Sequence, residues 1–146
     1  MHEFIRHLKA DHDKQRGLSK RLKTATDPQE RTSLRQELHD EVVPHMAGEE
    51  ASIFPYMQKS EDAYAREHAL EAVQEHHAGR LIMRELLELS PDSEIFKAKA
   101  SVLGEMNEHH MAEEENTHFP WLEQHVSKER LDALYKEYEA AEEAEK

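Results

Sequence analysis

Two stretches decide the fold: "PHMAGEEASIFPYM" at residues 44–57 and "HHMAEEENTHFPWL" at residues 109–122. Both contain the pattern His-Met-Ala-x-Glu-Glu-x-x-x-Phe-Pro, and a shift of 65 residues superimposes them. The same shift places His12 on His77. Because one offset relates the first half of the chain to the second, the sequence predicts two similar helical hairpins packed about a pseudo-twofold axis.

The composition favours a single α-helical domain. A chain of 146 residues is long enough to bury a core of its own. Glycine and proline are few, at 4 and 5, and good helix formers dominate. The absence of cysteine excludes disulfides, iron–sulfur clusters and zinc–thiolate sites held by this chain. Any metal chemistry must therefore use carboxylates and the 12 histidines.

The charge balance argues against two classes of partner. Nineteen Lys and Arg against thirty-two Asp and Glu give a formal charge of −13, which repels nucleic acid and anionic membrane surfaces. The longest apolar runs have three or four residues, and the N-terminus lacks the apolar segment of a signal peptide. We therefore expect no nucleic-acid partner and no membrane association, and a soluble, cytoplasmic protein.

Apolar residues recur at helical spacing in four long segments, at about 3–23, 28–58, 63–89 and 93–124. Asp27 before Pro28 is typical of a helix start, and Pro44 is expected to kink the second segment. Short connections predict an all-α, antiparallel up-down-up-down four-helix bundle. Ser127 is predicted to cap a short fifth helix. We expect a bundle at 1–125 and a C-terminal helical tail at 126–146.

Four histidines are evenly spaced along these helices. His12 and His45 are 33 residues apart, His45 and His77 are 32, and His77 and His110 are 33. Since a hairpin returns to the same height after equal lengths, all four can lie in one layer of the bundle. Glu49 and Glu114 follow His45 and His110 by four residues, on the same helix faces.

These residues share the apolar stripes of their helices, where an uncompensated carboxylate costs several kcal/mol. A pair of cations removes that cost, so we predict a dinuclear metal site. His12 and His45 would hold one ion, His77 and His110 the other, and Glu49 and Glu114 would bridge them. Imidazole with bridging carboxylates suits iron, manganese or zinc. Four protein ligands per ion leave positions open for water or a small ligand.

Several neighbours remain alternatives. His76 and His109 precede the predicted ligands and would replace them if a helix were rotated. His118 and Glu41, each four residues from a predicted ligand, are candidates for extra ligands or supporting groups. Glu50 and Glu115 are rotated by about 100° from the ligand face, so we expect them to be solvated or hydrogen-bonded outside it.

The repeated "HMAGEEASIFP" and "HHMAEEENTHFP", each preceded by a histidine in the previous helix ("ADHDK" and "EHHAG"), resemble the hemerythrin-like, or HHE cation-binding, domain over roughly residues 2–124. The resemblance implies a four-helix bundle with a non-haem, carboxylate-bridged pair of irons, and its ligand pattern matches His12, His45, Glu49, His77, His110 and Glu114. Oxygen-carrying members have His-x-x-x-His on the third helix, whereas here Val73 lies four residues before His77.

Three functions follow from this interpretation. The leading hypothesis is a diiron protein that binds dioxygen, nitric oxide or peroxide for sensing, storage or detoxification, as the resemblance implies, with zinc or manganese as the less favoured metals. The second is a diiron oxidase or peroxidase in which Glu41, His118 or Tyr56 moves protons. The third is a metal-stapled structural bundle whose acidic tail contacts another protein.

Overall fold

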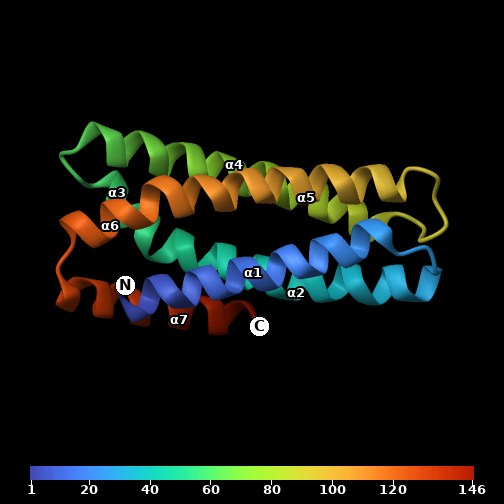
Figure 1. The fold of residues 1–146 in the computed structure, drawn as a ribbon, viewed down its shortest axis with the longest axis horizontal. Coiled ribbons are helices and arrows are strands. Elements are labelled where there is room, and N and C mark those ends of the chain that lie inside the picture. Colours follow the sequence, from blue (N-terminus) through green and yellow to red (C-terminus); the bar gives the residue numbers. More distant parts are fainter.

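The computed structural model describes all residues, 1–146, and contains helices without strands. Helices α1 and α2 form one hairpin and α4 and α5 the other, and both hairpins turn at the same end (Figure 1). The predicted all-α bundle of two hairpins with a fifth C-terminal helix is confirmed. The elements, in chain order, are α1 (Glu3–Thr24), α2 (Pro28–Ala51), α3 (Ile53–Gln58), α4 (Ala63–Glu88), α5 (Phe96–Glu113), the π-helix η1 (Glu114–His118), α6 (Phe119–His125) and α7 (Lys128–Glu145).

Side-chain oxygen atoms cap the N-termini of three of these helices. The Asp27 carboxylate accepts a hydrogen bond from the Glu30 amide at 3.3 Å, and Pro28 opens α2. Asp62 accepts from the Tyr64 amide at 2.9 Å, and the Ser127 hydroxyl accepts from the Arg130 amide at 3.1 Å. Each cap satisfies an amide that the helix itself leaves unpaired.

Both hairpins lose regular α-helical geometry at or shortly after their predicted glutamate ligand, Glu49 or Glu114. Helix α2 contains Pro44 without a break in the helix and ends at Ala51, before Ser52 (φ −126°, ψ −88°). In the other hairpin the π-helix η1 takes this place, and π turns are frequent at functional sites. A short helix then begins around each Phe-Pro pair. Proline suits this first turn because its missing amide proton has no partner there.

Two apolar clusters fill the bundle and leave a polar layer between them. One contains Phe4, Phe54 and Tyr138 at the end of the bundle where α3 and α6 lie. The other contains Leu22, Leu86 and Phe96 at the end where the hairpins turn. Along α1, α2, α4 and α5 with η1, the buried histidines and glutamates lie where the residues of one cluster give way to those of the other.

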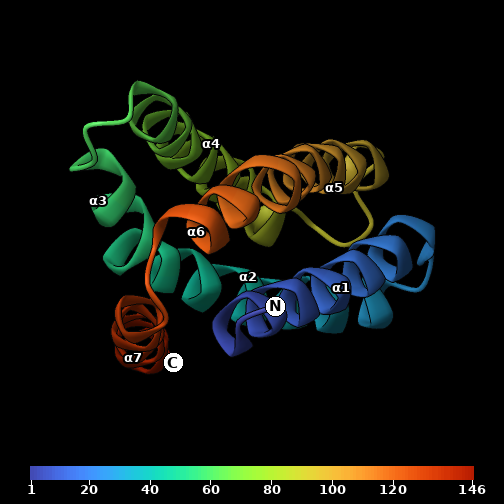
Figure 2. The ribbon, with the colours of Figure 1, turned by 60° about the vertical axis from the view of Figure 1, so that its left-hand side comes forward.

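Helix α7 lies along the outside of the first hairpin, next to α2 (Figure 2). It buries Leu131, Leu134 and Tyr138 against the bundle. The tail is therefore packed on the bundle over most of its length. No helix in the structure has both the length and the apolar character needed to cross a membrane.

Two leucines of α4 give a matched test of this packing. Leu86 is 0% exposed in the cluster at the hairpin turns, whereas Leu81 is 43% exposed. Leu86→Ala is expected to lower the free energy of unfolding by about 2–5 kcal/mol because it leaves a cavity. Leu81→Ala should change it by less than about 0.5 kcal/mol. Urea denaturation of the metal-free protein measures both, and equal losses would contradict the described packing.

Candidate metal centre

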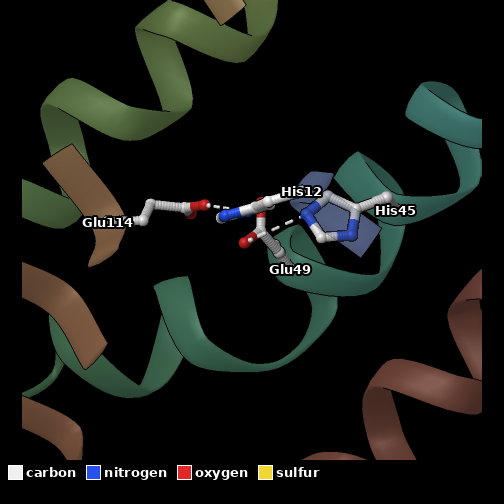
Figure 3. A group of neighbouring side chains, drawn as sticks. All are labelled: His12, His45, Glu49 and Glu114. Carbon is white, nitrogen blue, oxygen red and sulfur yellow. Dashed lines mark ion pairs between the residues drawn. The ribbon is translucent and has the colours of Figure 1, made fainter. Parts of the chain in front are cut away.

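Six buried side chains meet in the polar layer between the two apolar clusters. They form two groups of four that share Glu49 and Glu114, and within each group the potential ligand atoms lie within 4.8 Å of one another. Figure 3 shows the first group, His12 and His45 with the two glutamates. His76 and His110 complete the second. Four helical segments, α1, α2, α4 and α5 with η1, therefore contribute to one centre.

The structure brings together five of the six predicted residues and corrects the sixth. His77 is exposed on the surface of α4, and its neighbour His76, 1% exposed, lies in the cluster. The connection between α4 and α5 is the reason. His76 and His110 are 34 residues apart, one more than His12 and His45. The repeat offset is therefore 64 between α1 and α4, although it is 65 between α2 and α5.

Each glutamate lies closest to one histidine of each group. The Glu49 carboxylate lies 3.5 Å from His45 Nε2 and 3.2 Å from His76 Nε2. The Glu114 carboxylate lies 3.1 Å from His12 Nε2 and 3.4 Å from His110 Nε2. In both cases the two oxygens of the carboxylate divide between the two groups. This is the arrangement that two bridging carboxylates need.

Most inner atoms of this cluster lack hydrogen bonds; the exception is the contact between His76 Nε2 and His110 Nε2, at 3.0 Å. The contacts with Glu49 and Glu114 are short enough for ion pairs, but their angles leave His12 Nε2, His45 Nε2 and all four carboxylate oxygens without a hydrogen-bond partner. Both glutamates are 0% exposed. Such unpaired polar atoms are costly in an interior unless a cation lies among them. The donor set therefore fits a pair of metal ions.

The outer nitrogens of the four histidines have carboxylate partners. Nδ1 of His12 contacts Glu115, that of His76 contacts Glu50 and that of His110 contacts Glu75, each at 2.7 Å. The equivalent partner of His45 Nδ1 is Asp11, at 3.0 Å. An imidazole whose Nδ1–H donates to a carboxylate presents its Nε2 lone pair to a metal. All four rings are therefore oriented as metal ligands usually are.

This pattern explains the doubled glutamate of the repeat. The first glutamate points into the centre, and the second, Glu50 or Glu115, reaches a histidine of the other hairpin, as we expected of a hydrogen-bonded outer residue. Arg80 contacts Glu50 at 2.5 Å, and Arg16 contacts Glu115 at 3.0 Å. Each arginine lies one turn after a histidine of the cluster, so the charge of the outer carboxylates is balanced by residues that repeat with them.

The Phe-Pro phenylalanines form part of the wall of the centre. Phe119 stacks on His12 with ring centroids 5.6 Å apart, and Phe54 lies 5.0 Å from the ring of His76. Both phenylalanines are 0% exposed. Each repeat therefore supplies two ligands, a partner for a histidine of the other hairpin, and an apolar ring that covers that same histidine.

The remaining candidates lie outside both groups. His118 is buried, but its Nε2 lies 3.2 Å from the His68 carbonyl and its Nδ1 lies 3.0 Å from the Thr117 hydroxyl. Glu41 pairs with Lys14 at 3.0 Å. The exposed side chain of His109 and the Tyr56 ring, near Arg130, also lie elsewhere. With His76 in the cluster, the residue four positions earlier is Ala72, so α4 still lacks a second histidine there.

Comparison with known proteins agrees with this geometry. The model of the hemerythrin HHE cation-binding domain matches residues 3–122, which include all six residues of the cluster. The chain belongs to this family. Searches of curated proteins and of solved structures gave no match. The match ends before α7, so the helix that covers α2 lies outside the matched residues.

Charges within this HHE domain are tightly balanced. Burial disfavours a charged imidazole, but Glu49 and Asp11 outweigh it and raise the pKa of His45 to about 10. The same opposition of burial and carboxylates, chiefly Glu114, raises the pKa of His12 and His110. The pKa of Glu49 is lowered because His45 and the other histidines outweigh its burial. Without metal, protons on imidazoles therefore balance the buried carboxylates.

The two halves of the centre have different surroundings. A cavity of about 530 Å³ reaches His76 and His110, and its apolar lining includes Met46, Met83 and Leu103. On the opposite side, His45 lies against Tyr138 of α7, with ring centroids 5.8 Å apart. One half of the candidate metal centre therefore lies beside a cavity, and the C-terminal helix covers the other half.

The corrected ligand set predicts opposite results for adjacent histidines. His76→Ala removes a buried imidazole of the cluster and should reduce bound metal from two ions per chain to at most one. His77→Ala changes an exposed side chain and should leave metal content unchanged. Elemental analysis of both purified variants makes the comparison. Loss of metal from His77→Ala with full content in His76→Ala would restore His77 as the ligand.

The raised histidine pKa values predict that metal and protons compete. His45 is protonated below about pH 10 in the metal-free protein, so a metal entering at pH 7 must displace that proton. At least about one proton should be released per chain, and apparent affinity should rise about tenfold per pH unit for each proton released. Calorimetric titration with zinc in buffers of different ionisation enthalpy counts the protons. Affinity that does not change between pH 6 and 8 would contradict this balance.

Proposed function

We propose that this HHE domain is a non-haem diiron protein that binds dioxygen, nitric oxide or peroxide, and that it serves in sensing, storage or detoxification. The observation that carries the proposal is the pair of four-residue groups sharing two buried glutamates whose oxygens have no hydrogen-bond partner. His12 and His45 would hold one iron, His76 and His110 the other, and Glu49 and Glu114 would bridge. Reduced iron at such a site supplies electrons to a small ligand.

Ligand chemistry limits the choice of metal, and the family favours iron within it. Imidazole nitrogen with carboxylate oxygen suits iron, manganese and zinc alike, so the donor set alone narrows the choice to these three. Membership of the HHE family supports iron among them. Zinc or manganese in the same ligands is the alternative that metal analysis must address.

The residues around the centre support a reactive site more than a purely structural one. Four protein ligands per ion leave positions for an exogenous ligand. The cavity of about 530 Å³ beside His76 and His110 gives such a ligand a place next to one ion. Phe54 and Phe119 exclude water from the bundle side, and the carboxylates on each Nδ1 fix the imidazoles in position.

The same cavity favours a second candidate function, a diiron oxidase or peroxidase, because its volume exceeds that of a diatomic molecule. Against turnover, Glu41, His118 and Tyr56, which we considered as proton carriers, all lie outside the two ligand groups. Steady-state consumption of oxygen or peroxide separates the two candidates, because a binding protein takes up its ligand once per site.

Metal analysis and optical spectroscopy test the proposal together. Protein from iron-replete cells should contain about two irons per chain, and its reduced form should change its absorption spectrum on addition of dioxygen, nitric oxide or hydrogen peroxide. His110→Ala and Glu114→Ala should lose metal, and His39→Ala, on the partly exposed surface of α2, should keep it. Full zinc occupancy and a spectrum unaffected by all three ligands would instead support the structural bundle.

A further inference from the structure

The pseudo-twofold symmetry of the centre is broken at one position of the repeat. The variable residue of His-Met-Ala-x-Glu-Glu is Gly48 in the first half and Glu113 in the second. A Cβ at Gly48 would lie 2.5 Å from the Cδ2 and Cε2 atoms of Tyr138. Only a residue without a side chain allows α7 to seat this tyrosine against α2. The packing of the C-terminal helix against α2 therefore depends on glycine at position 48.

Tyr138 is 0% exposed, and its hydroxyl reaches the outer side of one histidine of the cluster. The hydroxyl oxygen lies 2.8 Å from His45 Nδ1 and 2.8 Å from Asp11 Oδ2. A third contact, with Glu142 of α7, is longer at 3.2 Å. His12, His76 and His110 have carboxylates at Nδ1 but no tyrosine. One of the four imidazoles is therefore held differently from the others.

The protons on His45 and on Tyr138 determine which group donates in these hydrogen bonds. A metal on His45 Nε2 requires the ring proton to be on Nδ1, where it is donated to Asp11 or to the tyrosine oxygen. The phenol keeps its single proton at neutral pH and donates it to the Asp11 carboxylate. Tyr138 thus closes a triangle with His45 and Asp11 in which every proton has an acceptor.

We propose that Tyr138 is a positioning residue of the metal centre, which holds His45 and Asp11 in the geometry for binding one of the two ions. The inference rests on the proposed dinuclear site. It adds a residue of α7, a helix beyond the region that matches the HHE domain. Through this contact the ion at His12 and His45 differs in affinity from the ion at His76 and His110.

Removal of the hydroxyl should therefore weaken one ion and spare the other. Loss of a hydrogen-bonding partner of a ligand typically costs 10–100-fold in metal affinity. Tyr138→Phe keeps the ring against Gly48 and should weaken one of the two zinc ions by about tenfold or more. Tyr135→Phe is the matched control, since Tyr135 lies on the same helix and stacks on Phe4 at 4.9 Å, away from the cluster. Its two zinc affinities should match the wild type.

Calorimetric titration of the full-length, metal-free chains with zinc measures both affinities. Thermal unfolding of the metal-free proteins shows in parallel whether a loss is only structural. The double variant Tyr138→Phe, Asp11→Asn should bind the weakened ion no more than about threefold less tightly than Asp11→Asn alone, because both groups hold the same His45 Nδ1 and losses within one hydrogen-bond network are not additive.

The outcomes separate this inference from the proposed function. Two zinc ions in the wild type with one weakened in Tyr138→Phe supports both. Two ions in the wild type with unchanged or equally weakened affinities in Tyr138→Phe overturns the role of Tyr138 and leaves the metal centre in place. A lower melting temperature of the metal-free variant with both affinities intact likewise overturns that role. A wild-type chain that binds no zinc and no iron overturns both.

Discussion

Glu49 and Glu114 are fully buried in the middle of the bundle, and no hydrogen bond within the protein satisfies their oxygens. Such carboxylates cost several kcal/mol each unless positive charge surrounds them. The other side chains of the polar layer are arranged to place positive charge around these two carboxylates. Four imidazoles point their Nε2 atoms at the two carboxylates, and a surrounding set of acidic side chains fixes the rings from outside. Two cations among these atoms would replace protons as the balancing charge.

Both copies of the internal repeat, one in each hairpin, supply side chains that surround the buried carboxylates. Each copy contributes an inward glutamate, an outward glutamate and a phenylalanine, and the last two act on a histidine of the other hairpin. Neither hairpin alone completes a group of four ligands, so assembly of the bundle and assembly of the centre are the same event. Asymmetry enters where Gly48 replaces the acidic residue of the second copy and α7 packs in its place.

Much of this arrangement could be predicted from the sequence. The spacing of apolar residues and the capping signal at Asp27 indicated the helices, and the repeat indicated the pairing of hairpins and five of the six clustered residues. His77 was wrong because a uniform offset of 65 was applied to all four helices. One extra residue in the connection before α5 shifts α4 by one position, and adjacent histidines there made both choices consistent with the pattern.

Other features had weaker signals in the sequence or none. Asp11 and Glu75 each directly precede a histidine of the cluster, so their role at a ring Nδ1 was detectable in principle from the offset of 64. The contact between Tyr138 and His45 spans 93 residues, and no periodicity or motif indicates it. The interruption of α2 at Ser52 had no signal in the sequence, because local propensity does not decide how a helix end packs.

The most direct test of the central claim is a crystal structure of the protein from iron-replete cells, with anomalous diffraction measured at the iron absorption edge. Two peaks about 3.5–4 Å apart are expected between Glu49 and Glu114. One should be bound by His12 and His45 and the other by His76 and His110. An electron-density map with both glutamates buried and no metal between them would contradict the account.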